Sequence, residues 1–202
     1  MFVQMFTAPV TDAQAVRATL EAWPTGAGRD AQGWLGSTAG ITDDGQLVSL
    51  ARFSSEDVAR ANSERPEQGQ WWAALAANLD GEASFFESTE VDEDLVGDPD
   101  TARFVQVMRG RVSDAERARE LASSDPDAWA GFRPDILGSL MLSHDDGEYV
   151  MAIYFTSEAE AREGEKSEPP AELVATMQEM GALEVGEVTY YDLRDPWLLS
   201  PS

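Results

Sequence analysis

The sequence contains no cysteine, and this absence excludes disulfide bonds, thiolate nucleophiles, cysteine-ligated zinc and cysteine-ligated iron–sulfur clusters. It contains a single histidine, His144, and a single lysine, Lys166. No apolar run approaches the roughly 18 residues that a membrane-spanning helix needs. The first residues, Met1 to Phe6, include no basic segment of the kind that opens a secretory signal peptide. The sequence therefore predicts a cytoplasmic protein.

Basic residues are also scarce. Fourteen lysines and arginines face 38 aspartates and glutamates, which gives a formal net charge of -24. Binding to a phosphate backbone or to anionic lipid headgroups depends on Lys and Arg that displace counterions. We therefore expect neither a nucleic acid nor a membrane as a partner, and we interpret the acidic surface as a source of solubility.

The main feature of the sequence is an internal repeat. A shift of 102 residues aligns residues 2–66 with residues 104–168 without a gap, and twenty of these 65 pairs are identical. The matches hold one register throughout, which indicates a duplication. They include Phe-Val-Gln at 2–4 and 104–106, Asp-Asp-Gly at 43–45 and 145–147, and Ala-Arg at 59–60 and 161–162.

Each copy predicts the same order of elements. A short apolar strand precedes a capping box, Thr11–Gln14 in one copy and Ser113–Glu116 in the other, which predicts the start of a helix. Two strands follow around the Asp-Asp-Gly turn, because Asp-Gly between apolar runs favours a hairpin. A second helix and a closing strand complete the copy; the closing strands are expected at 83–89 and 185–191.

The order β-α-β-β-α-β is that of a ferredoxin-like unit. The predicted fold class is α+β: two tandem ferredoxin-like repeats whose antiparallel sheets pack into a dimeric-type α/β barrel. Packing is expected because the sheet face without helices is apolar and would otherwise be exposed. The predicted boundaries are 1–91 for the first repeat, 92–102 for an acidic linker, 103–195 for the second repeat and 196–202 for a tail, where Trp197 is an aromatic anchor.

The stretch from Phe53 to Trp72, which includes Asn62 and Pro66, resembles the second-helix region of the antibiotic biosynthesis monooxygenase-like group of the dimeric α/β-barrel superfamily. This resemblance implies two such units in one chain, a pseudo-dimer, and leaves open a further homodimer. The group includes cofactor-independent oxygenases of polyketide quinones, which use no metal, and haem-degrading enzymes, which use a helical histidine. The lone His144 belongs to a predicted turn, so we expect no cofactor and no metal.

Two glutamines, Gln4 and Gln106, occupy equivalent positions in otherwise apolar strands. Burying an amide without a hydrogen bond costs about 1–3 kcal/mol, so each should have a partner. The partner is either a ligand or, as the alternative, a group within the protein across the pseudo-twofold axis.

Arg52 lies in another apolar strand, where the second copy has Tyr154. A guanidinium there needs an acceptor, which could be a carboxylate or phenolate of a ligand. The alternative is an ion pair at the barrel rim, for which Glu87 on the closing strand is a candidate.

Trp34, Trp71 and Trp72 could line a site for a flat aromatic ligand, although tryptophans also serve as packing residues. The second copy has Ile136 in place of Trp34 and no aromatic residue in place of Trp71 and Trp72, so any pocket should belong mainly to the first copy. The function predicted first is the binding of a small apolar or aromatic molecule. The alternative is a cofactor-independent monooxygenase that acts on a phenolic or quinone-type metabolite, for which the sequence offers no evident base.

Overall fold

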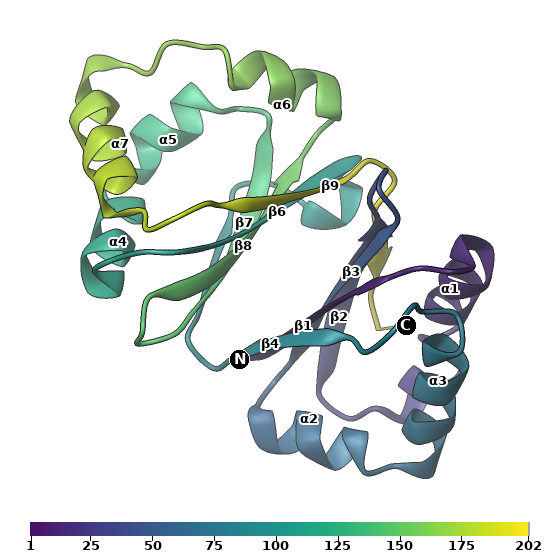
Figure 1. Ribbon diagram of the computed structural model, residues 1–202. Helices are drawn as coiled ribbons and strands as arrows, with labels where there is room; N and C mark the ends of the chain where they lie inside the picture. The colour runs from purple at the N-terminus through teal and green to yellow at the C-terminus, as the bar shows by residue number, and fades with distance from the viewer. Residues whose placement is uncertain (202) are drawn as a thin grey trace. The chain divides into compact units, whose positions relative to one another are not determined.

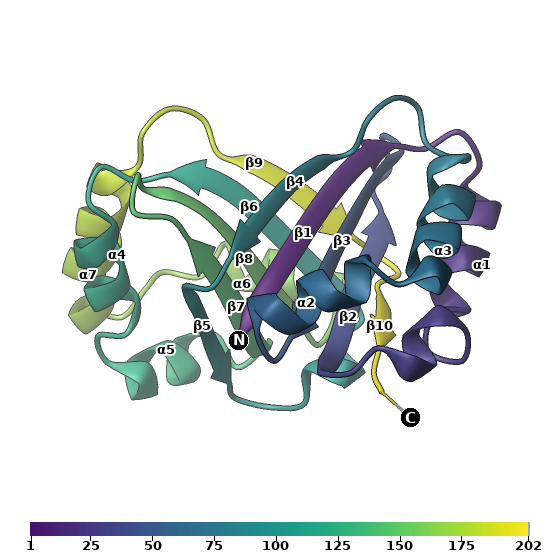
Figure 2. The same cartoon turned by 90° about the horizontal axis from the view of Figure 1, so that it is seen from below.

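A computed structural model describes residues 1–201, and of Asp127 the backbone alone. The chain divides into two compact units (Figure 1). The first unit comprises Met1–Val91 together with the segment from Leu193 onward, and the second comprises Asp92–Asp192. Each unit contains one antiparallel five-stranded sheet with helices on one face (Figures 1 and 2).

The first sheet has the strand order β10-β2-β3-β1-β4, and the second has the order β5-β7-β8-β6-β9. The two orders are equivalent under the internal repeat, which confirms two tandem α+β units of the ferredoxin-like type. How the two sheets pack stays a prediction. The first unit contains β1 (Phe2–Pro9), α1 (Ala13–Glu21), η1 (Ala27–Asp30), β2 (Trp34–Ile41), β3 (Gln46–Phe53), α2 (Glu56–Ser63), α3 (Pro66–Ala76), β4 (Ser84–Ser88) and β10 (Trp197–Leu199).

The second unit repeats these elements with more helical residues. It contains β5 (Val91–Leu95), η2 (Pro99–Thr101), β6 (Phe104–Arg111), α4 (Ala115–Ala122), α5 (Pro126–Phe132), β7 (Ile136–Ser143), β8 (Glu148–Phe155), α6 (Glu158–Gly164), α7 (Ala171–Leu183) and β9 (Thr189–Leu193).

The fifth strand of each sheet comes from a segment outside the repeated four-strand unit. The stretch interpreted from the sequence as an acidic linker contains β5, which pairs with β7, and the predicted tail contains β10, which pairs with β2. Trp197 on β10 is 8 % exposed and packs against the first unit, and the Arg17 guanidinium lies 5.4 Å from the centre of its ring.

The first helix of each copy begins one residue later than the capping boxes predicted. Asp12 and Asp114 are the N-cap residues, and their carboxylates accept hydrogen bonds from the backbone N–H groups of Ala15 (3.0 Å) and Arg117 (2.9 Å). An aspartate carboxylate caps a helix as well as a Ser or Thr hydroxyl does, and each capping box has its hydroxyl directly before an aspartate. The box pattern alone therefore does not show which of these two residues is the N-cap. The predicted hairpin turns are confirmed.

The single second helix expected from the sequence is divided in two. In the first unit α2 ends near Ser63, and α3 begins at Pro66, which is the first residue of its helix. Arg65 has an extended backbone, with φ −71° and ψ 136°, because the proline ring disfavours the helical conformation of the preceding residue. This break allows α3 to place Trp71 and Trp72 over the sheet.

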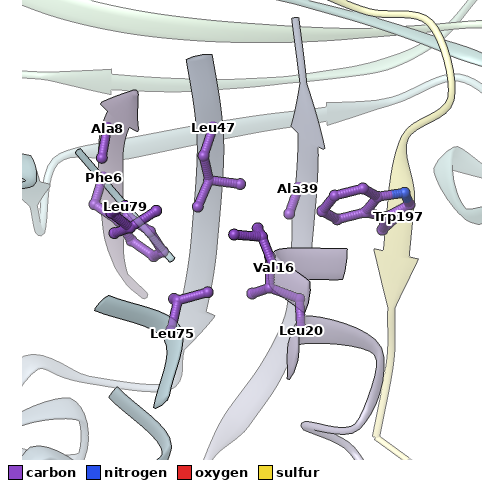
Figure 3. Packing of buried hydrophobic residues seen from close by; sticks show 9 residues of the cluster. All are labelled: Phe6, Ala8, Val16, Leu20, Ala39, Leu47, Leu75, Leu79 and Trp197. Atoms are coloured by element: carbon purple, nitrogen blue, oxygen red, sulfur yellow. The ribbon is translucent and has the colours of Figure 1, made fainter. Parts of the chain in front are cut away.

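Two hydrophobic clusters fill the space between the first sheet and its helices. We call them the Phe6 cluster and the Trp23 cluster. The Phe6 cluster consists of Phe6, Ala8, Val16, Leu20, Ala39, Leu47, Leu75, Leu79 and Trp197 (Figure 3). The Trp23 cluster consists of Phe2, Trp23, Ala31, Trp34 and Phe53. Trp71 packs against both clusters, and β1 contributes Phe2 to one and Phe6 to the other.

Candidate functional site

Gln4 lies on the helix side of the first sheet, between the two hydrophobic clusters. Side chains alternate along a strand, so Gln4 points the same way as Phe2 and Phe6. Its partner in the antiparallel register is Glu87 on β4, and its Nε2 donates a hydrogen bond to the Glu87 carboxylate. The partly buried amide therefore has a partner within its own sheet.

The Glu87 carboxylate also lies near a guanidinium of α2. Arg60 Nη2 is 3.7 Å from Glu87 Oε2, and the same guanidinium bonds Glu56 one turn earlier at 2.6 Å. The hydrogen bond to Glu56 raises the pKa of Arg60 above its ordinary value. Because the Arg60 side chain is 61 % exposed, its pair with Glu87 contributes little to stability.

The second unit contains the same amide–carboxylate–guanidinium arrangement. Gln106 Nε2 donates to Asp192 Oδ1 at 2.9 Å, and Arg162 pairs with the other oxygen of Asp192. Arg162 also lies 5.1 Å above the Phe104 ring. The sequence indicated the glutamines and Arg60 and Arg162 as repeated residues. It did not indicate the carboxylates as equivalent, because Glu87 and Asp192 are 105 residues apart and the other pairs are 102 apart.

Three aromatic side chains lie beside the Gln4–Glu87 pair, and we call them the aromatic patch. Trp72 meets Phe6 edge to face with ring centroids 5.2 Å apart. Phe85 lies 5.9 Å from Phe6 and 5.7 Å from Trp72. Phe85 is 46 % exposed and Trp72 is half-buried, so this patch reaches the protein surface. Phe6 pairs with Phe85 just as Gln4 pairs with Glu87.

Trp34 and Trp71 have the contacts of packing residues. Trp34 is 5 % exposed, and its indole N–H donates to Ser37 Oγ at 3.0 Å. Trp71 lies 4.8 Å from Trp23, and its indole N–H donates to the Thr19 carbonyl at 3.0 Å. Both N–H groups are thus used within the protein, and a ligand-binding role for these two residues stays a prediction.

Arg52 and Tyr154 lie on the opposite face of their sheets from the other candidate residues. Their chain neighbours Phe53 and Phe155 belong to clusters on the helix side, so Arg52 and Tyr154 point away from the helices. The Arg52 guanidinium packs on Gly36, where an added Cβ would lie 2.8 Å from Nη2. The same alternation places Glu87 on the helix side with Gln4, so the register argues against the Arg52–Glu87 pair considered from the sequence.

The second unit also differs from the first at Tyr149, which replaces Leu47. Its phenol donates to Glu184 Oε1 at 2.8 Å and lies over Gly110, where an added Cβ would be 2.9 Å from the oxygen. Burial, then the hydrogen bond to Glu184, raises the pKa of Tyr149 well above its ordinary value. The space for this ring exists because residue 110 is glycine, where the first copy has Ala8.

We predict that Tyr149 ionises only well above the pH at which a free tyrosine ionises. Because its folded-state pKa is raised, the protonated phenol favours folding; this contribution is fully present below about pH 10 and is lost as the pH rises further. An alkaline titration followed by tyrosinate absorbance should show a late component, and Tyr149→Phe should reduce its amplitude. A late component of unchanged amplitude in Tyr149→Phe would contradict the assignment.

Among residues 1–126 and 128–201, no group of three or more His, Asp or Glu side chains could hold a metal ion. His144 lies at the turn between β7 and β8, where its backbone bonds Glu148 and Gly147. In the same part of the chain, no helix is long and apolar enough to cross a membrane.

No protein-family model matches the sequence, and no curated protein matches it. Solved structures do match it along its whole length. A protein from Lactobacillus acidophilus, provisionally named a monooxygenase, has a TM-score of 0.72 at 10 % identity, and the match covers 98 % of this chain and 99 % of that one. A similarly named protein from Fusobacterium nucleatum has a TM-score of 0.74 at 9 % identity, with 98 % and 94 % coverage.

A third structure, of an anthrone oxidase-like protein, has a TM-score of 0.66 at 10 % identity and covers 98 % of this chain and 92 % of that one. At these identities the similarity establishes the fold. The expected fold, two tandem ferredoxin-like units in one chain, is thereby confirmed.

Proposed function

We propose that the protein binds a small apolar or aromatic molecule on the helix side of its first unit. The ring system of the ligand packs against the aromatic patch of Phe6, Trp72 and Phe85, and its polar end points toward Gln4 and Glu87. The observation that carries this proposal is the shared register of β1 and β4, which places an aromatic pair next to an amide–carboxylate pair. The two pairs are two residues apart along each strand, roughly 7 Å, about the length of a phenol.

The asymmetry between the units supports this location. The positions of Phe6, Trp72 and Phe85 correspond to Met108, Val174 and Tyr190 in the second unit, by shifts of 102, 102 and 105 residues. The polar pair is therefore present in both units, whereas an aromatic wall beside it exists in the first. Flat aromatic ligands gain most from such a wall because ring contacts add to the burial of apolar area.

We predict that Trp72→Ala and Phe85→Ala each weaken the binding of 1-naphthol at least tenfold, because each removes one side of the aromatic patch. Isothermal titration calorimetry measures the affinities, and thermal unfolding shows whether each variant remains folded. The matched controls are Val174→Ala and Tyr190→Ala at the equivalent positions of the second unit, for which no change is expected. Equal losses in both units, or none in the first, would refute the location.

A second candidate function is that of a cofactor-independent monooxygenase acting on a phenolic or quinone-type metabolite. Two observations support it: chains of the same tandem fold have been provisionally named monooxygenases, and the register of β1 and β4 places the Glu87 carboxylate next to the aromatic patch. Glu87 would remove a proton from an activated CH₂ of the substrate, and the carbanion would supply electrons to O₂. The resulting hydroperoxide would lose water, so that R₂CH₂ and O₂ give R₂C=O and H₂O. The protein would contribute deprotonation, a dry surface and the Gln4 N–H as an oriented donor.

A further inference from the structure

The amide oxygen of Gln68 is buried and has no hydrogen-bond partner among the described residues. Gln68 lies on α3, three and four residues before Trp71 and Trp72, so it is on the face of the helix that carries these rings. Leu75 on the same face is fully buried in the Phe6 cluster, which shows that this face points to the sheet. A buried acceptor without a donor is unfavourable, so its retention needs an explanation.

The course of α3 over the sheet places Gln68 near the polar end of the candidate site. Trp72 packs against Phe6 of β1, and after the helix Leu79 forms a bridge with Val10, just beyond the end of β1. The helix therefore advances in the same direction as β1. Gln68 lies one helical turn, about 5.4 Å, before Trp72, and Gln4 lies two residues before Phe6 on β1. The two glutamines therefore lie toward the same end of the candidate site.

Several donors around this end of the site are already used within the protein. The indole N–H groups of Trp34 and Trp71 are used within the protein, and Gln4 donates to Glu87. The buried Gln68 amide oxygen, in contrast, is an acceptor that has no donor among the described residues. A ligand bound here is recognised through a hydrogen that it donates.

We propose that Gln68 is a specificity-determining residue that accepts a hydrogen bond from a hydroxyl group of the ligand. The site then selects phenols and hydroquinones over quinones and aryl ethers of the same size. A quinone or ether brings no donor and leaves the buried Gln68 oxygen without a partner, and this is how binding sites reject analogues that lack a hydroxyl. This inference rests on the proposed binding function and names the chemical class of the ligand.

The test compares 1-naphthol with 1-methoxynaphthalene, which has the same rings but no hydroxyl donor. Calorimetric titration of the wild-type protein should show at least a tenfold preference for 1-naphthol. Gln68→Met keeps the length of the side chain and removes the acceptor, and it should lower this preference at least fivefold by weakening 1-naphthol alone. Gln70→Met, an exposed position on the same helix, is the matched control and should retain the preference.

Thermal unfolding provides an independent readout. Gln68→Met replaces a buried acceptor that has no partner, so its melting temperature should equal or exceed that of the wild type. A marked drop in melting temperature would show that the Gln68 amide is structural and would overturn the inference. Equal binding of the two probes by the wild type would overturn it as well, with the proposed binding function intact. If neither probe binds, the proposed function itself fails.

Discussion

Replacing Gly147 by alanine is expected to destabilise the protein by about 3–4 kcal/mol, a large effect for one methyl group. Gly147 has a φ of +87°, and alanine in the left-handed region costs about 1–2 kcal/mol. The added Cβ would also lie far inside contact distance of the Val112 carbonyl oxygen. That contact is with backbone, and the N–H of Val112 bonds the Gly147 carbonyl at 2.9 Å, so neither segment moves without losing a hydrogen bond.

The internal repeat provides the matched control. Gly45 occupies the equivalent turn of the first unit with a φ of +81°, and an added Cβ there would meet nothing within 4 Å. Gly45→Ala should therefore cost only the backbone penalty of about 1–2 kcal/mol. Urea unfolding of the two variants measures the difference. Equal destabilisation would show that the close approach of Val112 has no energetic consequence.

Replacing Glu87 by glutamine is expected to lower the rate of oxidation of a phenolic substrate by about 10²- to 10⁴-fold, the usual contribution of a positioned base. Glutamine has the same shape and can still accept the hydrogen bond from Gln4, so the fold and the binding of 1-naphthol should change little. Oxygen consumption with an anthrone-type substrate, in which a CH₂ is flanked by aromatic rings, measures the effect.

The matched control is Asp192→Asn, the equivalent change in the second unit, which should leave the rate unchanged. If Glu87→Gln retains the full rate, Glu87 is not the base. If the wild-type protein consumes no oxygen but binds 1-naphthol, the monooxygenase candidate is wrong and the binding function remains.

Much of the fold was predictable because its determinants are local. The Asp-Asp-Gly turns require a residue that adopts a positive φ, and Gly45 and Gly147 both do so. The strands β1, β2 and β3 are buried along most of their length, as their apolar runs indicate, and a duplication doubles every such signal. The strand β5 was not predicted, because its sequence Val-Asp-Glu-Asp-Leu is mostly charged and its pairing with β7 depends on a segment 40 residues away in the chain.

The candidate site was predictable only in part. Local pattern identified Gln4 as a buried amide and Trp72 as an aromatic residue of a helix. Pairing Gln4 with Glu87, rather than Arg52 with Glu87, follows from the register between β1 and β4, which are separated by most of the first unit.

The sequence by itself determined the duplication, the order of elements, the turns and the chemical character of each strand, because these depend on neighbours within a few residues. Only the tertiary structure decided which side chains meet. Gln68 shows the reason: its sequence neighbours indicate a polar position near the start of a helix, and its burial beside the sheet arises from the direction in which α3 crosses β1. That direction is determined by packing between segments far apart in the chain, which no local pattern contains.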